Sequence, residues 1–109
     1  MTDEKPWINF SPFDKFSWPK PWTRIFVDFG PAAGYRFAWG YLDFAEDDAP
    51  IFVFDIDTER RVPFTRVRSW REETKKPGPT VVWKYRSLAA HRQGDAALNR
   101  RLKNLGVRL

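Results

Sequence analysis

The sequence predicts a mainly β (α+β) domain: a small five- or six-stranded antiparallel barrel or bent sheet, with an aromatic, Pro-rich N-terminal arm and a C-terminal helix. Short runs of β-branched and aromatic residues are separated by turn-forming segments, and the end of the chain has helical composition. The 109 residues suffice for one domain with its own hydrophobic core. Because exposed strand edges promote aggregation, we expect the sheet to close on itself.

The N-terminal arm is expected at residues 1–21, ahead of a single β-rich domain at 22–109. Residues 6–22 contain six aromatic residues and four prolines. The prolines exclude one continuous helix, so we expect an extended segment with a single turn near 12–16. Two interpretations stay open. Either the arm wraps around the domain and completes its core, or it docks a partner through its aromatic side chains, which are Trp7, Phe10, Phe13, Phe16 and Trp18.

The first hairpin is predicted at residues 22–42. Residues 22–29 alternate in polarity, as a half-buried strand does. The segment 30–34 is bounded by glycines but lacks the Lys and Ser or Thr of a phosphate-binding loop, so we expect a hairpin turn. The following strand has small residues, including Gly40, on the face where a neighbouring strand or a ligand can approach closely. Its other face carries Tyr35, Phe37, Trp39 and Tyr41.

A second hairpin is predicted at residues 51–73. The apolar run 51–56 reads as a buried strand, and residues 57–60 form the turn. On the return, the apolar alternation slips by one residue between Phe64 and Val67, which predicts a bulge or a tight turn at 65–66. This strand, tight turn and basic strand resemble part of the small SH3-like or Sm-like barrels. The resemblance implies a closed barrel.

The remainder of the chain is expected to form a loop, a strand and a helix. The composition of residues 72–79 is typical of a mobile loop, and the alternation of residues 80–86 predicts the last strand. Asp95 is a favourable N-cap for a helix at about 95–105, and Gly106 is placed to end it. Leu98, Leu102 and Leu105 form its apolar stripe.

Charge is divided unequally along the chain. Residues 1–59 hold five Lys or Arg and eleven Asp or Glu, a net charge of −6, whereas residues 60–109 hold fourteen and three, a net of +11. The basic half is expected to attract polyanions. The acidic residues could bind Mg²⁺ or Ca²⁺, but the glycine of an EF-hand loop is missing, so a solvated turn is favoured and no metal site is expected. These residues are Asp43, Glu46, Asp47, Asp48, Asp55 and Asp57.

Catalysis has few candidate residues. One histidine, no cysteine and four serines leave little for nucleophilic or general-base chemistry, and His91 is expected to be a surface or capping residue. We therefore expect a protein that is not an enzyme and needs no cofactor. The absence of cysteine and of a long apolar run predicts a soluble, cytoplasmic protein without membrane association.

The function that this pattern predicts is nucleic-acid binding, to RNA or DNA, through a basic, aromatic face in the C-terminal half. Arginine suits phosphates and base edges, and aromatic rings accept unstacked bases. The candidate residues are Arg66, Arg68, Trp70, Arg71, Lys84, Tyr85, Arg86, Arg100 and Lys103. The alternative is a protein-binding accessory or inhibitory factor of the phage or mobile-element type. It would dock on a larger protein or nucleoprotein assembly through the arm and its bipolar charge, and self-association stays possible.

Overall fold

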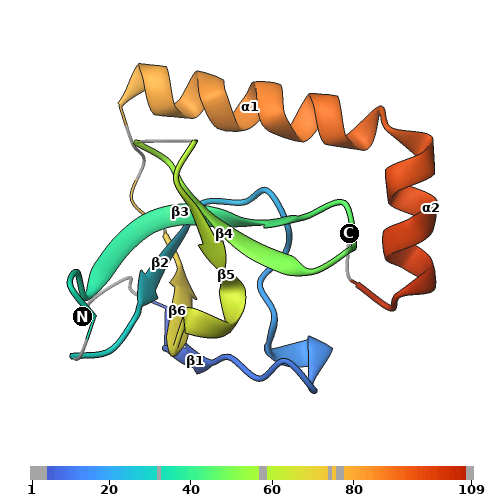
Figure 1. Cartoon of the computed structure of the whole chain (residues 1–109). Coiled ribbons are helices and arrows are strands. Elements are labelled where there is room, and N and C mark those ends of the chain that lie inside the picture. Colours follow the sequence, from blue (N-terminus) through green and yellow to red (C-terminus); the bar gives the residue numbers. More distant parts are fainter. Residues whose placement is uncertain (1–4, 32, 57–58, 74, 76–77, 108–109) are drawn as a thin grey trace.

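The fold is an antiparallel sheet followed by two helices, in a computed structural model that describes residues 5–31, 33–56, 59–73, 75 and 78–107 (Figure 1). The sheet has six strands in the spatial order β1-β6-β2-β3-β4-β5. Along the chain, the elements are β1 (Ile8–Asn9), the short 3₁₀ turn η1 (Lys15–Ser17), β2 (Ile25–Asp28), β3 (Phe37–Phe44), β4 (Pro50–Phe54), β5 (Arg61–Pro63), η2 (Phe64–Arg66), β6 (Ser69–Glu72), α1 (Pro79–Gln93) and α2 (Ala96–Asn104).

The sheet is open, so the expected closed barrel, and with it the resemblance to SH3-like or Sm-like barrels, is wrong. β1 and β5 are its two edges, and in the described part of the chain they do not pair with each other. Closure is not needed to protect these edges because β1 has only two residues and β5 only three. β5 also ends in Pro63, which has no amide proton to offer another strand.

The first predicted hairpin is confirmed. The second is confirmed only as far as β5, because β6, which was expected to continue its return strand, pairs with β1 and β2 instead. β2 and β3 pair on either side of the turn at 30–34, and β4 pairs with β5. The slip in the alternation corresponds to η2, whose single turn separates β5 from β6. Residue 32 of the first predicted turn, residues 57–58 of the second and residues 74, 76 and 77 of the predicted loop lie outside the described residues.

The strand predicted at 80–86 is wrong, because these residues lie in α1. Pro79 begins the helix, at a position where its missing amide proton is not needed. The predicted C-terminal helix is confirmed as α2: the Asp95 carboxylate accepts a hydrogen bond from the Leu98 amide at 3.0 Å, and Gly106 has a φ of +81° just beyond its end. Neither α1 nor α2, the two α-helices of the described residues, is long and apolar enough to cross a bilayer.

One face of the sheet forms the main core. Ile25, Val27, Leu42 and Phe52 lie on this face and are completely buried. The N-terminal arm covers it with Phe10 and Trp18, whose ring centroids are 5.7 Å apart, and η2 adds Phe64, 4.8 Å from the Phe10 ring. Leu98 and Leu102 of α2 are buried in the same cluster. Part of the arm therefore completes the core.

Gly40 allows β3 and β4 to approach each other, as the small residues on this face of the strand suggested. A Cβ atom at this position would lie 2.5 Å from the Phe52 ring and closer still to the Val53 carbonyl. Any larger residue would force these two central strands apart.

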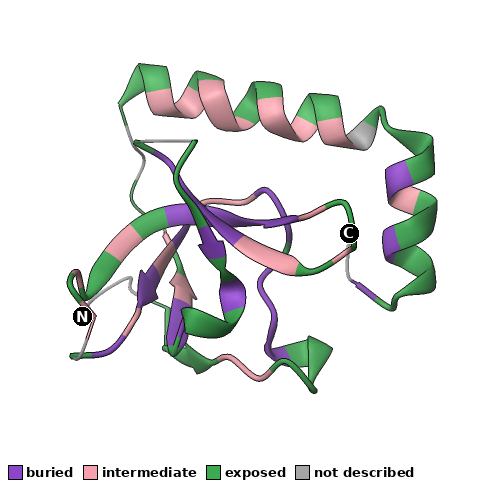
Figure 2. Ribbon diagram, viewed as in Figure 1, coloured by how far each residue is buried: buried purple, intermediate pink, exposed green. Residues whose placement is uncertain are grey.

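The opposite face of the sheet is only half covered. α1 lies over one end of it, where the Tyr85 ring meets Tyr41 edge-on at 5.6 Å and Arg92 pairs with Asp43 at 3.0 Å. Among its described side chains α1 has no buried residue; those facing the sheet are half-buried and the others are exposed (Figure 2). The helix therefore rests on the sheet through a few contacts and leaves the other end of this face open.

Candidate functional site

Four aromatic rings lie side by side on the open end of this face. Phe26 of β2 is the centre of the group: its ring centroid is 4.6 Å from Trp39, 5.5 Å from Phe37 and 5.7 Å from Trp7. Phe26 is half-buried, whereas the other three side chains are 40–47% exposed. The period of two along β2 and β3 produces this arrangement, because Phe26 and Trp39 are directly paired in the ladder.

Three arginine side chains lie against these rings. The Arg71 guanidinium is 4.8 Å from the Trp7 centroid and 5.2 Å from that of Phe26, Arg36 is 5.1 Å from Phe37, and Arg24 is 5.6 Å from Trp39. The cation–π attraction holds the charged groups beside rings that still reach solvent. We call these seven residues the aromatic–arginine face: Trp7, Arg24, Phe26, Arg36, Phe37, Trp39 and Arg71.

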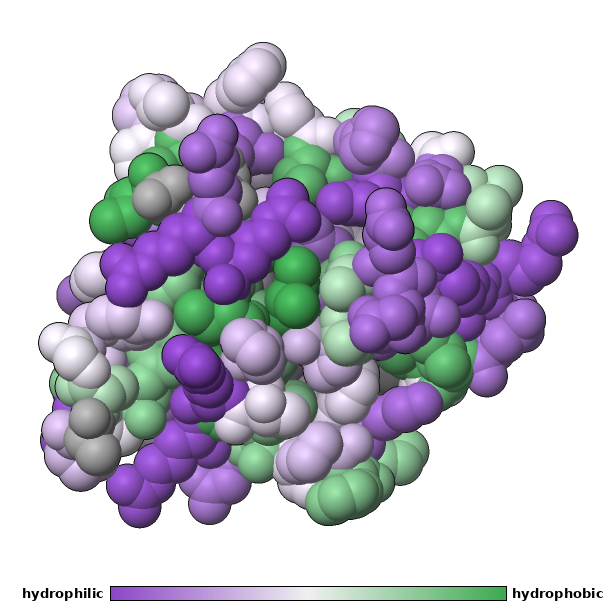
Figure 3. All heavy atoms as spheres, viewed as in Figure 1, coloured by the Kyte–Doolittle hydropathy of each residue, from purple (hydrophilic) through white to green (hydrophobic). Residues whose placement is uncertain are grey.

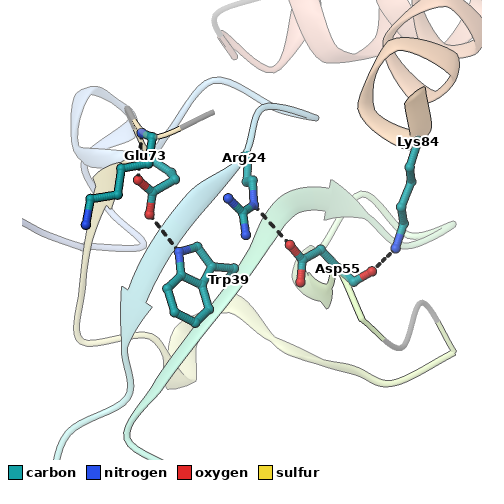
Figure 4. A network of polar contacts seen from close by, with 6 residues as sticks. Arg24, Trp39, Asp55, Glu73 and Lys84 are labelled. Atoms are coloured by element: carbon teal, nitrogen blue, oxygen red, sulfur yellow. Dashed lines mark hydrogen bonds and ion pairs between the residues drawn. The ribbon is translucent and has the colours of Figure 1, made fainter. Parts of the chain in front are cut away.

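Carboxylates fix two of these side chains in place. The Trp39 indole donates a hydrogen bond to Glu73 at 2.6 Å, and Arg24 Nε donates to Asp55 at 3.0 Å (Figure 4). Burial opposes ionisation of Glu73, but the hydrogen bonds from Trp39 and from the Lys75 amide outweigh it and lower the pKa of Glu73. Trp39 and Arg24 are thus oriented before any ligand arrives.

Arg36 is held in the same way at the other side of the face. It contacts both carboxylate oxygens of Asp28, at 3.2 and 3.4 Å, and the Gly30 amide donates to Asp28 Oδ1 at 2.7 Å. Burial alone would raise the pKa of Asp28, yet these donors lower it. The hairpin turn and the arginine therefore share one ionised carboxylate.

The residues predicted to bind nucleic acid do not form one surface. Arg71 belongs to the aromatic–arginine face, but Trp70 points to the opposite side and is buried, with its indole donating to the Ser17 carbonyl at 2.6 Å. Tyr85 and Lys84 face the sheet from α1, where Lys84 donates to the Asp55 carbonyl. The other candidates are exposed elsewhere, on η2 and the residue before β6, on α1 and on α2: Arg66, Arg68, Arg86, Arg100 and Lys103.

The aromatic residues predicted for docking divide into three groups. Phe10 and Trp18 pack in the core, and Trp7 joins the aromatic–arginine face. Phe13 and Phe16 are 97% and 84% exposed. Figure 3 shows hydrophobic side chains on the surface at the lower end of the molecule, where Figure 1 places η1. Of the five aromatic residues predicted for docking, Phe13 and Phe16 therefore have the most exposed side chains.

The acidic residues that were considered for a metal are mostly paired with arginines. Asp43 pairs with Arg92, Asp48 with Arg101 and Asp55 with Arg24. Within the described ranges, no three His, Asp or Glu side chains are grouped so that they could hold a metal ion, and Asp57 lies outside these ranges. His91 is exposed on α1.

Sequence reasoning missed five residues of this face because it looked for the binding surface in the basic half of the chain: Arg24, Phe26, Arg36, Phe37 and Trp39. Their signal was present: Arg24 and Phe26 share one side of the alternating strand, and Phe37 and Trp39 share one side of the next. Which side of the sheet stays uncovered depends on where α1 lies, and no local pattern contains that information.

The arrangement provides flat apolar rings next to fixed positive charges, without a nucleophile or a metal ligand cluster among these seven side chains. It is suited to binding a planar, anionic molecule. Comparison of the chain with protein-family models, with curated proteins and with solved structures finds no match in any of the three.

Proposed function

We propose that this protein is a non-enzymatic module that binds single-stranded nucleic acid, RNA or DNA, on the aromatic–arginine face. The proposal rests mainly on one observation: four aromatic rings and three guanidinium groups lie together at the open end of one face of the sheet. Bases of a single strand stack on exposed rings, and arginines pair with the phosphates between them. The partner is unpaired nucleic acid because a duplex keeps its base faces covered by neighbouring bases.

The net charge of the chain and the absence of cysteine support this proposal. A net charge of +5 attracts a polyanion over a distance, and a chain with no cysteine is suited to the reducing cytoplasm, where we propose that it acts. No cofactor takes part, because binding of this kind needs only the rings and the cations.

The test is fluorescence anisotropy with labelled single-stranded RNA and DNA of about ten nucleotides and with duplex DNA, from about 50 to 200 mM salt. Phe37→Ala is expected to weaken single-strand binding about 5- to 150-fold, since stacking contributes about 1–3 kcal/mol per base. Arg71→Gln is expected to lower the salt slope by about 0.7.

Two control variants remove similar side chains outside the face. Trp83→Ala removes a ring that is 71% exposed on α1, and Arg100→Gln removes a cation from α2. Both should bind as the wild type does. Wild-type binding by Phe37→Ala, or a larger effect of Arg100→Gln than of Arg71→Gln, would contradict the proposed site.

The second candidate function is docking on a larger protein or nucleoprotein assembly, in the manner of an accessory or inhibitory factor of phages or mobile elements, or on a second copy of the chain. The observation that favours it is the exposure of Phe13 and Phe16 at 97% and 84%. This docking surface includes η1 and shares no residue with the aromatic–arginine face, so one protein could serve both functions.

A further inference from the structure

A groove of about 390 Å³ runs between α1 and the start of β2, beside the aromatic–arginine face. Its walls are largely apolar and include Trp22, Val82, Tyr85 and Ala89. This volume falls within the range of roughly 300–1,000 Å³ that is usual for small-molecule sites. The groove exists because α1 presents small side chains such as Ala89 to this part of the sheet, so the helix rests above the sheet without filling the space.

Charged side chains line the mouth of the groove. Arg24, Lys75 and Arg86 contribute three cations, and Glu73 contributes one anion. Both oxygens of Glu73 already accept hydrogen bonds, from the Trp39 indole at 2.6 Å and from the Lys75 amide at 2.9 Å. Arg24 is also paired with Asp55 at 3.0 Å, so these three cations exceed the two carboxylates beside them by one charge. An apolar slot whose rim has an excess of positive charge matches a flat base that carries a phosphate.

A second observation concerns Tyr85, which lines this groove. Its hydroxyl is buried and has no hydrogen-bond partner among the described residues. Burial, and next the charge of Asp55, raise the pKa of Tyr85, so the hydroxyl stays protonated and able to donate. Tyr85 therefore brings an unpaired hydrogen-bonding group to the residues that line the groove.

The groove is continuous with the proposed stacking surface. Arg24 lies against the Trp39 ring and also lines the groove, and Glu73 binds Trp39 and lines it as well. Figure 4 shows Arg24 beside Trp39, with Glu73 hydrogen-bonded to the indole. A strand that stacks on Phe37 and Trp39 thus reaches the mouth of the groove without crossing another element.

We infer that this groove binds one nucleotide, the terminal unit of the strand that crosses the aromatic–arginine face, with its base between Trp22 and α1 and its phosphate at Arg86 and Arg24. This inference rests on the proposed function, but it makes a prediction that can be tested separately from strand binding. A nucleoside monophosphate should bind in the groove by itself, whereas stacking on the open face requires a longer strand.

The experiment follows the amide resonances of ¹⁵N-labelled full-length protein during titration with AMP and with CMP. The expected shifts lie at residues of the groove, namely Trp22, Val82, Arg86 and Ala89. Ala89→Phe, which fills the groove, should weaken binding about tenfold or more. Ala90→Phe is the matched control, since Ala90 is the next residue and is exposed on the outer side of α1.

A second pair of variants keeps the test valid if Ala89→Phe does not fold. Arg86→Glu reverses a charge at the rim, and Arg100→Glu makes the same change on α2; both side chains are exposed. Only Arg86→Glu should weaken AMP binding, by about tenfold. Phe37→Ala should leave AMP binding unchanged, because Phe37 is not part of the groove.

The outcomes separate the two claims. If oligonucleotides bind in a manner that depends on Phe37 while AMP and CMP shift no groove residue, the groove inference is overturned and the proposed function stands. If adenosine binds as well as AMP and Arg86→Glu has no effect, the phosphate assignment is overturned. If neither oligonucleotides nor monophosphates bind, both claims fail.

Discussion

At the scale of single residues, one buried carboxylate links the hairpin turn to the aromatic–arginine face. Asp28 accepts hydrogen bonds from the Gly30 amide and from Arg36. Removing its charge affects the position of Arg36 as well as the stability of the turn. The sequence showed that Asp28 lies on the same side of the strand as Arg24 and Phe26, but not that Arg36 would meet it.

Asp28→Asn is expected to lower the free energy of unfolding by about 1 kcal/mol at neutral pH. Asn still accepts from the Gly30 amide, but it lacks the charge that attracts Arg36. Because folding lowers the pKa of Asp28, its stabilisation is present above the unfolded value of 3.8 and is lost as the pH falls through the lower folded value. Urea unfolding at several pH values should show the two proteins converging in acid. A difference in the free energy of unfolding that stays constant with pH would contradict the role of the Asp28 charge. The control variant is Glu46→Gln, in the exposed β3–β4 turn.

Gly40 provides a second prediction at this scale. Gly40→Ala is expected to destabilise the protein by about 3 kcal/mol or more, because the new Cβ meets the Val53 carbonyl and the Phe52 ring. Gly34→Ala is the control, since a Cβ there has no atom within 4 Å and should change stability by less than about 0.5 kcal/mol. Thermal unfolding measures both variants, and similar melting temperatures for the two would exclude this close approach of β3 and β4.

At the scale of elements, the main error of sequence reasoning was to expect a strand at 80–86. Alternating Val, Trp and Tyr favour a strand locally. The same residues also suit a helix, because Val81, Tyr85 and Leu88 then fall on one side and face the sheet. No turn signal separates residue 86 from the helical segment that follows, and Pro79 marks a helix start. The strands around the two hairpins were predictable because their partners are close in sequence.

The N-terminal arm combines two kinds of aromatic residue, and their substitution should separate them. Trp18→Ala is expected to cost about 3–5 kcal/mol, as removal of a large core side chain does. The double variant Phe13→Ser/Phe16→Ser should unfold within about 0.5 kcal/mol of the wild type, because both rings are exposed. Denaturant titration measures this difference. A large loss in the double variant would show that these rings serve folding, and would remove the reason to treat them as a docking surface.

At the scale of the whole molecule, the pairing that the sequence could not show is that of distant strands. β6 lies between β1 and β2, so the end of the second hairpin joins the first hairpin and the arm. Hydrophobic patterns specify which residues are buried, but they do not specify the order of strands in a sheet. The expectation that the sheet closes was also wrong. The edge strands β1 and β5 are short enough to be protected without closure.

The charge difference between residues 1–59 and 60–109 was expected to attract polyanions, but part of it is neutralised by ion pairs within the molecule. The acidic half and the basic half meet inside the molecule: Arg92 pairs with Asp43, and Arg101 with Asp48. These pairs hold α1 and α2 to the sheet, so part of the charge difference is used within one molecule.

The distribution of tryptophan gives the protein a built-in optical reporter. Trp18, Trp22 and Trp70 are buried, and Trp7, Trp39 and Trp83 are between 40% and 71% exposed. The buried indoles emit at shorter wavelength and are shielded from quenchers in the solvent, whereas the exposed ones emit at longer wavelength. Two of the three exposed indoles belong to the aromatic–arginine face. A base stacked on them would therefore quench the emission at long wavelength and leave the emission at short wavelength unchanged. Unlabelled protein can therefore report occupancy of its own surface.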